Sequence, residues 1–143
     1  MANSFAHIEL STDDVRRARD FYKKIFSWKF RDLGPAMGHY VMVDVGDKGA
    51  GGGLTPKMMP SQPTGWLPYV EVKSVKATIS AAEEAGAKIV VPYQEIGKMG
   101  AIGIFIDPTG ATLGLWETAK PSKRLKTAAK KKQTTKKKSA KKR

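Results

Sequence analysis

The chain has 143 residues, a length that suits one compact domain with its own core. It contains no cysteine, which excludes disulfides and thiolate metal sites. Residues 120–143 hold 13 of the 26 Lys and Arg and none of the 13 Asp and Glu, so the net charge of +13 lies entirely at this end. Residues 1–119 are formally neutral.

The N-terminus lacks the basic region and apolar run of a signal peptide. No stretch approaches the roughly 18 apolar residues of a membrane-spanning helix. We therefore expect a cytoplasmic protein without a membrane span.

The first predicted element is a strand at residues 5–12. Ile8 and Leu10 alternate there with His7 and Glu9, which is the two-residue period of a strand. His7 and Glu9 should therefore share the face opposite to the apolar pair.

A helix should follow, because residues 11–14 supply capping and acidic side chains for its first turn. Its apolar stripe consists of Val15, Ala18, Tyr22, Ile25 and Phe26. Three further strands are predicted at residues 27–33, 39–45 and 50–55.

Residues 56–66 contain three prolines and read as a linker, after which the pattern restarts. A strand at 67–73 leads to a helix that Ser74 caps and Gly86 ends. The remaining predicted strands are 88–91, 101–107 and 111–117.

The restart indicates an internal repeat of about 60 residues, with one copy at 4–55 and the other at 67–118. Aligning the two copies places Asp14 on Ser74 and Gly53 on Gly114. Each copy reads β-α-β-β-β and leaves one sheet face bare when alone. The predicted fold is therefore α+β, with two βαβββ repeats forming a curved eight-stranded mixed sheet around a cleft and the helices outside. Two unrelated strand–helix stretches are the alternative.

Five segments, which follow one another in the expected order along the chain, carry a resemblance to a known family: residues 7–22, 26–28, 68–72, 85–88 and 105–117. On these segments the chain resembles the vicinal oxygen chelate superfamily, which contains glyoxalase I, bleomycin-resistance proteins and extradiol dioxygenases. The resemblance covers residues 4–118. Ser27 departs from it, because family members usually have glycine there.

The resemblance implies four metal-ligand positions, which fall on His7, Gly53, Leu67 and Gly114. Only His7 carries a donor atom, so we expect no metal cofactor and a degenerate site. A divalent ion held by His7 with Glu9 or Glu71 is the alternative, and it would suit a lyase or a dioxygenase.

The candidate catalytic residues are His7 and Glu9. The candidate ligand-binding residues are Trp66, Tyr69 and Trp116, with Gly53 and Gly114 widening the cleft. Core packing is the alternative role for each aromatic side chain. A small-molecule ligand and a homodimer are the expected partners of the body.

Residues 120–143 contain no acid and one large apolar residue, Leu125, so we expect a disordered basic tail. The tail resembles those of histone H1-type and bacterial nucleoid proteins. It should bind DNA or RNA through phosphates, without base stacking because it has no aromatic residue. A solubilising role, an anionic membrane and an acidic protein are alternatives. The candidate polyanion-binding residues are Lys130, Lys131, Lys132, Lys136, Lys137, Lys138, Lys141, Lys142 and Arg143.

The sequence therefore favours a glyoxalase-like protein that binds, and in one reading transforms, a small organic molecule without the standard metal centre. A metal-dependent enzyme and a nucleic-acid-associated protein remain as alternatives.

Overall fold

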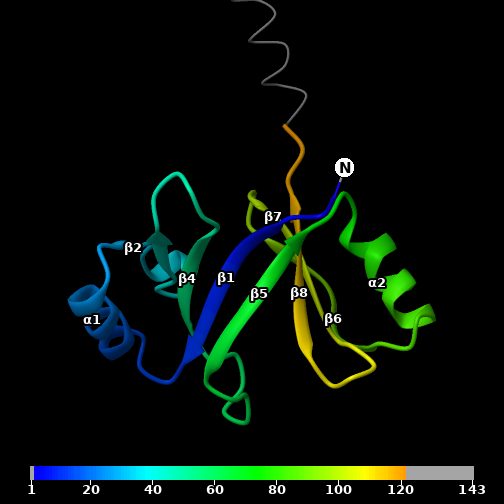
Figure 1. The fold of residues 1–143 in the computed structure, drawn as a ribbon, viewed down its shortest axis with the longest axis horizontal. Helices are drawn as coiled ribbons and strands as arrows, with labels where there is room; N and C mark the ends of the chain where they lie inside the picture. Colours follow the sequence, from blue (N-terminus) through cyan, green and yellow to red (C-terminus); the bar gives the residue numbers. More distant parts are fainter. Residues whose placement is uncertain (1, 122–143) are drawn as a thin grey trace, which may run out of the picture.

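A computed structural model describes residues 2–121 of the chain (Figure 1). Its elements are β1 (Phe5–Thr12), α1 (Val15–Ile25), β2 (Lys29–Asp32), a 3-10 turn η1 (Pro35–Met37), β3 (Val41–Asp44), β4 (Gly51–Pro56), β5 (Gly65–Glu71), α2 (Val75–Glu84), β6 (Lys88–Ile96), β7 (Gly100–Ile106) and β8 (Thr112–Thr118). The predicted α+β fold with two βαβββ halves is confirmed. The prediction of a disordered tail concerns residues that lie almost entirely outside the described part.

The eight strands form one mixed sheet in the order β2-β3-β4-β1-β5-β8-β7-β6. β1 pairs with β4 and β5 pairs with β8 in parallel, whereas β1 and β5 meet antiparallel at the centre. We call this central β1–β5 pair the seam, because it joins the two halves.

The strand register reveals the duplication directly. Glu9 lies opposite Gly53 in the first half, and Tyr69 lies opposite Gly114 in the second. Across the seam, His7 lies opposite Tyr69 and Glu9 lies opposite Leu67. The repeat alignment equates His7 with Leu67 and Glu9 with Tyr69, so these two cross-seam pairs are related by an approximate two-fold axis.

Each helix covers its own half of the sheet, and the two helices lie at opposite ends of the molecule in Figure 1. Under α1, the buried core consists of Leu10, Val41, Val43 and Leu54. Under α2, it consists of Val72, Val75, Ile79 and Leu115. Because side chains alternate along a strand, His7 and Glu9 point to the face opposite to Leu10 and α1.

Side-chain caps position both helices, as the sequence predicts. Asp14 Oδ1 accepts a hydrogen bond from the Arg17 amide at 2.9 Å, and Ser74 Oγ accepts one from the Ala77 amide at 3.2 Å. Gly86 has a φ of 96° just after α2, a conformation that glycine adopts without strain.

The predicted and observed strand boundaries differ most at β6, which continues to Ile96 instead of ending at residue 91. Pro92 would interrupt a central strand because it has no amide hydrogen. β6 is an outer strand of the sheet, and its pairing with β7 becomes irregular between Val91 and Gln94. An edge position therefore tolerates the proline.

Among residues 2–121, neither helix has the length and apolar character that crossing a bilayer requires.

Candidate functional site

A hydrogen bond between His7 and Tyr40 anchors the candidate site. His7 lies on β1, and Tyr40 immediately precedes β3. The Tyr40 hydroxyl lies 2.5 Å from His7 Nε2, and the two rings are stacked with their centroids 6.2 Å apart. This contact joins residues that are 33 positions apart in the chain.

Glu9 and Tyr69 complete the group. The Tyr69 hydroxyl donates a hydrogen bond to Glu9 Oε1 at 3.3 Å, and Tyr40 also hydrogen-bonds the Glu9 carboxyl group. Glu9 Oε2 lies 3.9 Å from His7 Nε2. We refer to His7, Glu9, Tyr40 and Tyr69 as the His7 group.

Two glycines make room for the two tyrosines. A Cβ atom at Gly53 would lie on the Tyr40 hydroxyl, and a Cβ at Gly114 would lie 2.4 Å from Tyr69 Cδ1. Both distances are far below van der Waals contact. We predicted that these glycines widen a cleft; instead, tyrosine rings fill the space that they leave.

The His7 group is only partly buried. The side chains of His7 and Glu9 keep 24% and 19% of their exposure, so solvent reaches both groups. Tyr69 is 4% exposed and belongs to the interior. Water therefore reaches the imidazole and the carboxyl group, whereas the Tyr69 ring is packed inside the protein.

Burial shifts the pKa values of His7 and Glu9 in opposite directions. It lowers the pKa of His7, because the charged imidazolium loses hydration. It raises the pKa of Glu9, although hydrogen bonds from Tyr40 and Tyr69 work against that shift. The pKa of each tyrosine is raised, first by burial and then by the neighbouring Glu9 charge. Both phenols therefore stay protonated and can donate.

The connectivity allows proton movement within the group. The Tyr40 hydroxyl has one proton and can also accept, so it can donate to Glu9 while accepting from His7 Nε2–H. When the His7 proton sits on Nδ1, the same hydroxyl donates to Nε2. A change of tautomer at His7 thus redirects the Tyr40 proton, which couples the imidazole to the carboxyl group.

The residues do not fit the metal centre that the resemblance implies. Of its four positions, Gly53, Leu67 and Gly114 have no donor side chain. Nothing within residues 2–121 brings three His, Cys, Asp or Glu side chains together in a metal-holding arrangement. Glu71, predicted as an alternative ligand to Glu9, accepts a hydrogen bond from the Thr118 hydroxyl at 3.1 Å. Two donors with solvent access do not make the three-ligand site that catalytic zinc uses.

Trp66 lies away from the His7 group, although we predicted both at one cleft. Its indole nitrogen donates to the Tyr22 hydroxyl at 3.2 Å, and its ring packs edge-on against Tyr22. Trp66 lies opposite Leu10 across the seam, on the helix side of the sheet. Strand alternation separates it from Tyr69, three positions further along β5.

Trp116 shares a sheet face with Tyr69 but makes its polar contact elsewhere. Its indole nitrogen donates to Thr118 Oγ1 at 3.0 Å, and Thr118 in turn bonds Glu71. These three side chains form a separate row beside the His7 group. The nine tail residues predicted to bind polyanions lie outside the described residues.

Sequence reasoning missed Tyr40. The indication was the glycine run in the strand that became β4, since such a run requires a close neighbour. Nothing local identified that neighbour, because Tyr40 lies outside the regular strands and reaches Gly53 from 13 residues away.

Comparison with known families agrees with this geometry. Residues 4–115 match the model of the Glyoxalase/Bleomycin resistance protein/Dioxygenase superfamily. The chain belongs to this superfamily. The resemblance found in the sequence is therefore confirmed at the level of the superfamily.

Curated relatives in the superfamily are longer proteins. The chain is 31% identical over 116 residues to "Putative glyoxylase CFP32" of Mycobacterium tuberculosis, covering 77% of this chain and 44% of that protein. It is 24% identical over 125 residues to "Anthracycline biosynthesis protein DnrV" of Streptomyces peucetius, covering 78% of this chain and 46% of that protein. The chain thus spans less than half the length of these relatives.

Solved structures share the superfamily fold. Methylmalonyl-CoA epimerase from Mycobacterium tuberculosis has a TM-score of 0.62 and 16% identity, covering 87% of this chain and 91% of its own. Homoprotocatechuate 2,3-dioxygenase from Brevibacterium fuscum has a TM-score of 0.58 and 15% identity, covering 85% of this chain and 38% of its own. At these identities the likeness concerns the fold alone.

Proposed function

We propose that this protein binds a small carbonyl compound at the His7 group and moves a proton on it without the superfamily's metal centre. The observation that carries the proposal is the contact between Tyr40 and His7, with Glu9 beside them. It places a carboxyl group of raised pKa and an imidazole of lowered pKa within one hydrogen-bonded, solvent-accessible cluster. Groups shifted in this way are suited to general acid–base work.

In this proposal Glu9 exchanges the proton with the bound molecule. Tyr69 and Tyr40 hydrogen-bond the carboxylate and hold it in place. His7 sets the direction of the Tyr40 hydroxyl through Nε2. The choice of a carbonyl compound draws on a relative named as a putative glyoxylase and on an epimerase that shares the fold. A carbonyl group acidifies the neighbouring C–H bond.

The test measures proton exchange directly. The full chain is incubated in D₂O with a chelator and one of three probes: pyruvate, dihydroxyacetone, or the adduct of methylglyoxal and glutathione. NMR then follows deuterium entering the carbon next to the carbonyl. We expect exchange above the buffer rate with at least one probe, and a loss of about a hundredfold or more in Glu9→Gln.

Tyr69→Phe is the matched variant, because it removes one hydrogen bond to Glu9 and keeps the ring over Gly114. We expect it to lower exchange less than Glu9→Gln does. Exchange that appears only after zinc, nickel or iron is added would overturn the metal-free part of the proposal. Exchange unchanged in Glu9→Gln, or absent with all three probes, would overturn the whole.

The charge distribution favours a second candidate function, binding of polyanions by residues 120–143. All of the net positive charge lies in this segment, and lysines bind phosphates by releasing counterions. The variant with Gln at Lys130, Lys131, Lys132, Lys136, Lys137 and Lys138 tests it on duplex DNA across a salt series. We expect the slope of log affinity against log salt to fall by about 0.9 for each phosphate that the variant no longer neutralises. An unchanged slope would contradict this function.

A further inference from the structure

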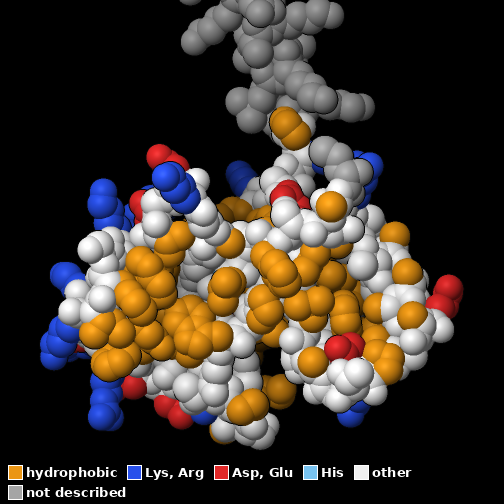
Figure 2. Space-filling view, viewed as in Figure 1, with side chains coloured by type: hydrophobic (Ala, Val, Ile, Leu, Met, Phe, Trp, Pro, Cys, Tyr) orange, Lys and Arg blue, Asp and Glu red, His pale blue; other side chains and the backbone are white. Residues whose placement is uncertain are grey.

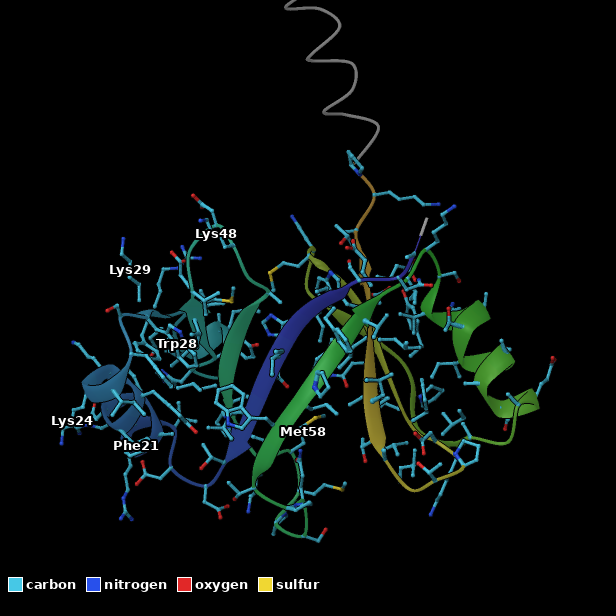
Figure 3. The ribbon with its side chains drawn as sticks, in the orientation of Figure 1. Phe21, Lys24, Trp28, Lys29, Lys48 and Met58 are labelled. Carbon is cyan, nitrogen blue, oxygen red and sulfur yellow. The ribbon has the colours of Figure 1, made fainter. Side chains whose placement is uncertain are left out.

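Two neighbouring hollows lie on the corner formed by α1 and β2. The first, of about 460 Å³, is lined by Asp14, Arg16, Arg17, Asp20, Phe21 and Lys24. The second, of about 530 Å³, is lined by Arg19, Asp20, Lys23, Trp28, Lys29 and Phe30. The first hollow has one ring, three Lys or Arg and two acids, and the second has two rings, three Lys or Arg and one acid. The two hollows share Asp20. Figure 3 labels one ring and one lysine of each: Phe21 with Lys24, and Trp28 with Lys29.

This corner is the positive end of a body that is neutral overall. Residues 15–31 contain seven Lys or Arg and a single acid, Asp20. The rest of residues 1–119 contains six Lys or Arg and twelve Asp or Glu. Asp20 is itself paired with Arg19 at 3.1 Å. With Asp14, which also lines the first hollow, the two linings together carry six Lys or Arg and two acids, so the corner attracts anions.

Exposed aromatic rings accompany the charge. Phe21 is 55% exposed and Phe26 is 44% exposed. Phe26 lies against Trp28 with ring centroids 4.6 Å apart, and Trp28 meets Trp66 at 6.4 Å. Figure 2 shows hydrophobic side chains gathered on the α1 side, with Lys and Arg along the outer edge. Phe21 therefore offers an exposed ring to a partner, whereas Trp28 is half-buried and offers only the part of its ring that the core and Phe26 leave uncovered.

The charge and shape select among possible partners. A second copy docked here about a two-fold axis would bring two strongly positive surfaces together, which is repulsive. A helix that lies on a bilayer has its charged residues on the face opposite to its apolar side chains, whereas Phe21 and Trp28 each lie among three Lys or Arg. Rings set among cations suit a partner with alternating flat bases and phosphates.

We propose that the α1–β2 corner binds single-stranded nucleic acid, with bases stacking on Phe21 and Trp28 and phosphates lying on the surrounding Lys and Arg. Single-strand-binding proteins in general combine a basic groove with stacking rings, and this chain places both in adjoining hollows. The site is separate from the tail, which has no aromatic residue and can supply charge alone.

The test uses the full chain and three probes: a twelve-nucleotide oligothymidylate, a twelve-base-pair duplex and inorganic polyphosphate. Tryptophan fluorescence reports stacking, since Trp28 and Trp66 lie at the corner. Anisotropy of a labelled oligonucleotide reports affinity, and competition with it ranks the other two probes. We expect the oligothymidylate to quench fluorescence and polyphosphate to leave it unchanged, even though both carry many negative charges.

Phe21→Ala should weaken oligothymidylate binding about fivefold or more and leave polyphosphate binding as it is. Phe5→Ala is the matched control, because Phe5 is 64% exposed and lies outside the corner. The double variant Lys24→Gln with Lys29→Gln should lower the salt slope for the oligonucleotide by about 1.4. Its matched control is Lys88→Gln with Lys98→Gln, two exposed lysines of the other half.

Equal binding of the oligothymidylate by the parent, Phe21→Ala and the double lysine variant would overturn the proposal. So would equal quenching by polyphosphate, which would indicate charge alone. The corner would be assigned to a membrane instead if phosphatidylserine vesicles bound the parent more tightly than the oligonucleotide does and if Phe21→Ala lost that binding. Quenching should persist when the six tail lysines are Gln, so the tail function and this site can fail separately.

Discussion

The ring of Tyr69 lies directly over Gly114, on the parallel strand beside it, where a Cβ would come within 2.4 Å of the ring. Because Gly114 has no side chain, it leaves a space beside its backbone, and the Tyr69 ring occupies that space. Tyr69 is 4% exposed, so its ring has no room to retreat.

Gly114→Ala should therefore destabilise the protein by about 1–3 kcal/mol, the usual cost of overpacking a core. The clash is with Cδ1, Cε1 and Cγ, so the whole ring must move. Denaturant unfolding measures the change. Gly65→Ala is the control, since a Cβ there meets nothing within 4 Å. An equal and small effect in both variants would contradict the packing described for Tyr69.

Gly53→Ala should act on the site more than on stability. The new Cβ would coincide with the tip of the Tyr40 side chain, which can swing away from the sheet. Tyr40 would then no longer hydrogen-bond His7. The Nε2 chemical shift of His7 should change in Gly53→Ala as it does in Tyr40→Phe. A shift like that of the parent would mean that Tyr40 keeps its place.

The stability of the protein should depend on His7 in mildly acid solution. The folded-state pKa of His7 lies below its usual value of 6.5, because burial disfavours the charged ring. The unfolded chain therefore takes up the proton first, and stability is lost as the pH falls from about 6.5 toward the lowered pKa. Chemical denaturation between pH 7.5 and 5 should show a smaller loss in His7→Gln than in the parent. Parallel curves would contradict the shift.

Glu9 should produce the opposite slope. Burial raises its folded-state pKa above the usual 4.5, so the folded protein holds this proton more tightly than the unfolded chain. Stability from this group is present below pH 4.5 and is lost as the pH rises through the raised pKa. Glu9→Gln should consequently gain stability relative to the parent as the pH increases through that window. A constant difference across the window would count against the raised pKa.

Glu117 should contribute to the stability of the second half through the start of α2. Its Oε2 atom accepts a hydrogen bond from the Val75 amide at 2.8 Å, and Val75 is fully buried. Glu117→Ala leaves that amide without this acceptor, which costs about 1–3 kcal/mol. Glu84→Ala, at the exposed end of the same helix, should change the free energy of unfolding by less than about 0.5 kcal/mol.

The sequence predicted the elements well where local chemistry decides them. β1 runs from Phe5 to Thr12 as expected, and Asp14 and Ser74 cap the helices. It predicted β6 poorly, because Pro92 argues against a strand unless the strand is known to be at an edge. Position in the sheet is a tertiary property, which the residues around Pro92 do not encode.

The candidate site was predicted in part for a similar reason. His7, Glu9 and Tyr69 follow from strand parity and the repeat, and the structure brings all three together. Tyr40 and the filling of Gly53 depend on a contact across three strands. Trp66 was grouped with Tyr69 as a candidate ligand-binding residue, although their spacing of three along one strand puts them on opposite faces.

The approximate two-fold axis through the seam has a consequence for the orientation of a bound molecule. The backbone of the duplicated strands forms an approximately symmetric frame, but the side chains at equivalent positions differ. His7 corresponds to Leu67, and Glu9 corresponds to Tyr69. A molecule lying across the axis would meet an imidazole and a carboxyl group on one side, and an isobutyl group and a phenol on the other. Turning an unsymmetrical molecule end to end would therefore change its contacts, so this frame distinguishes the two orientations of such a molecule.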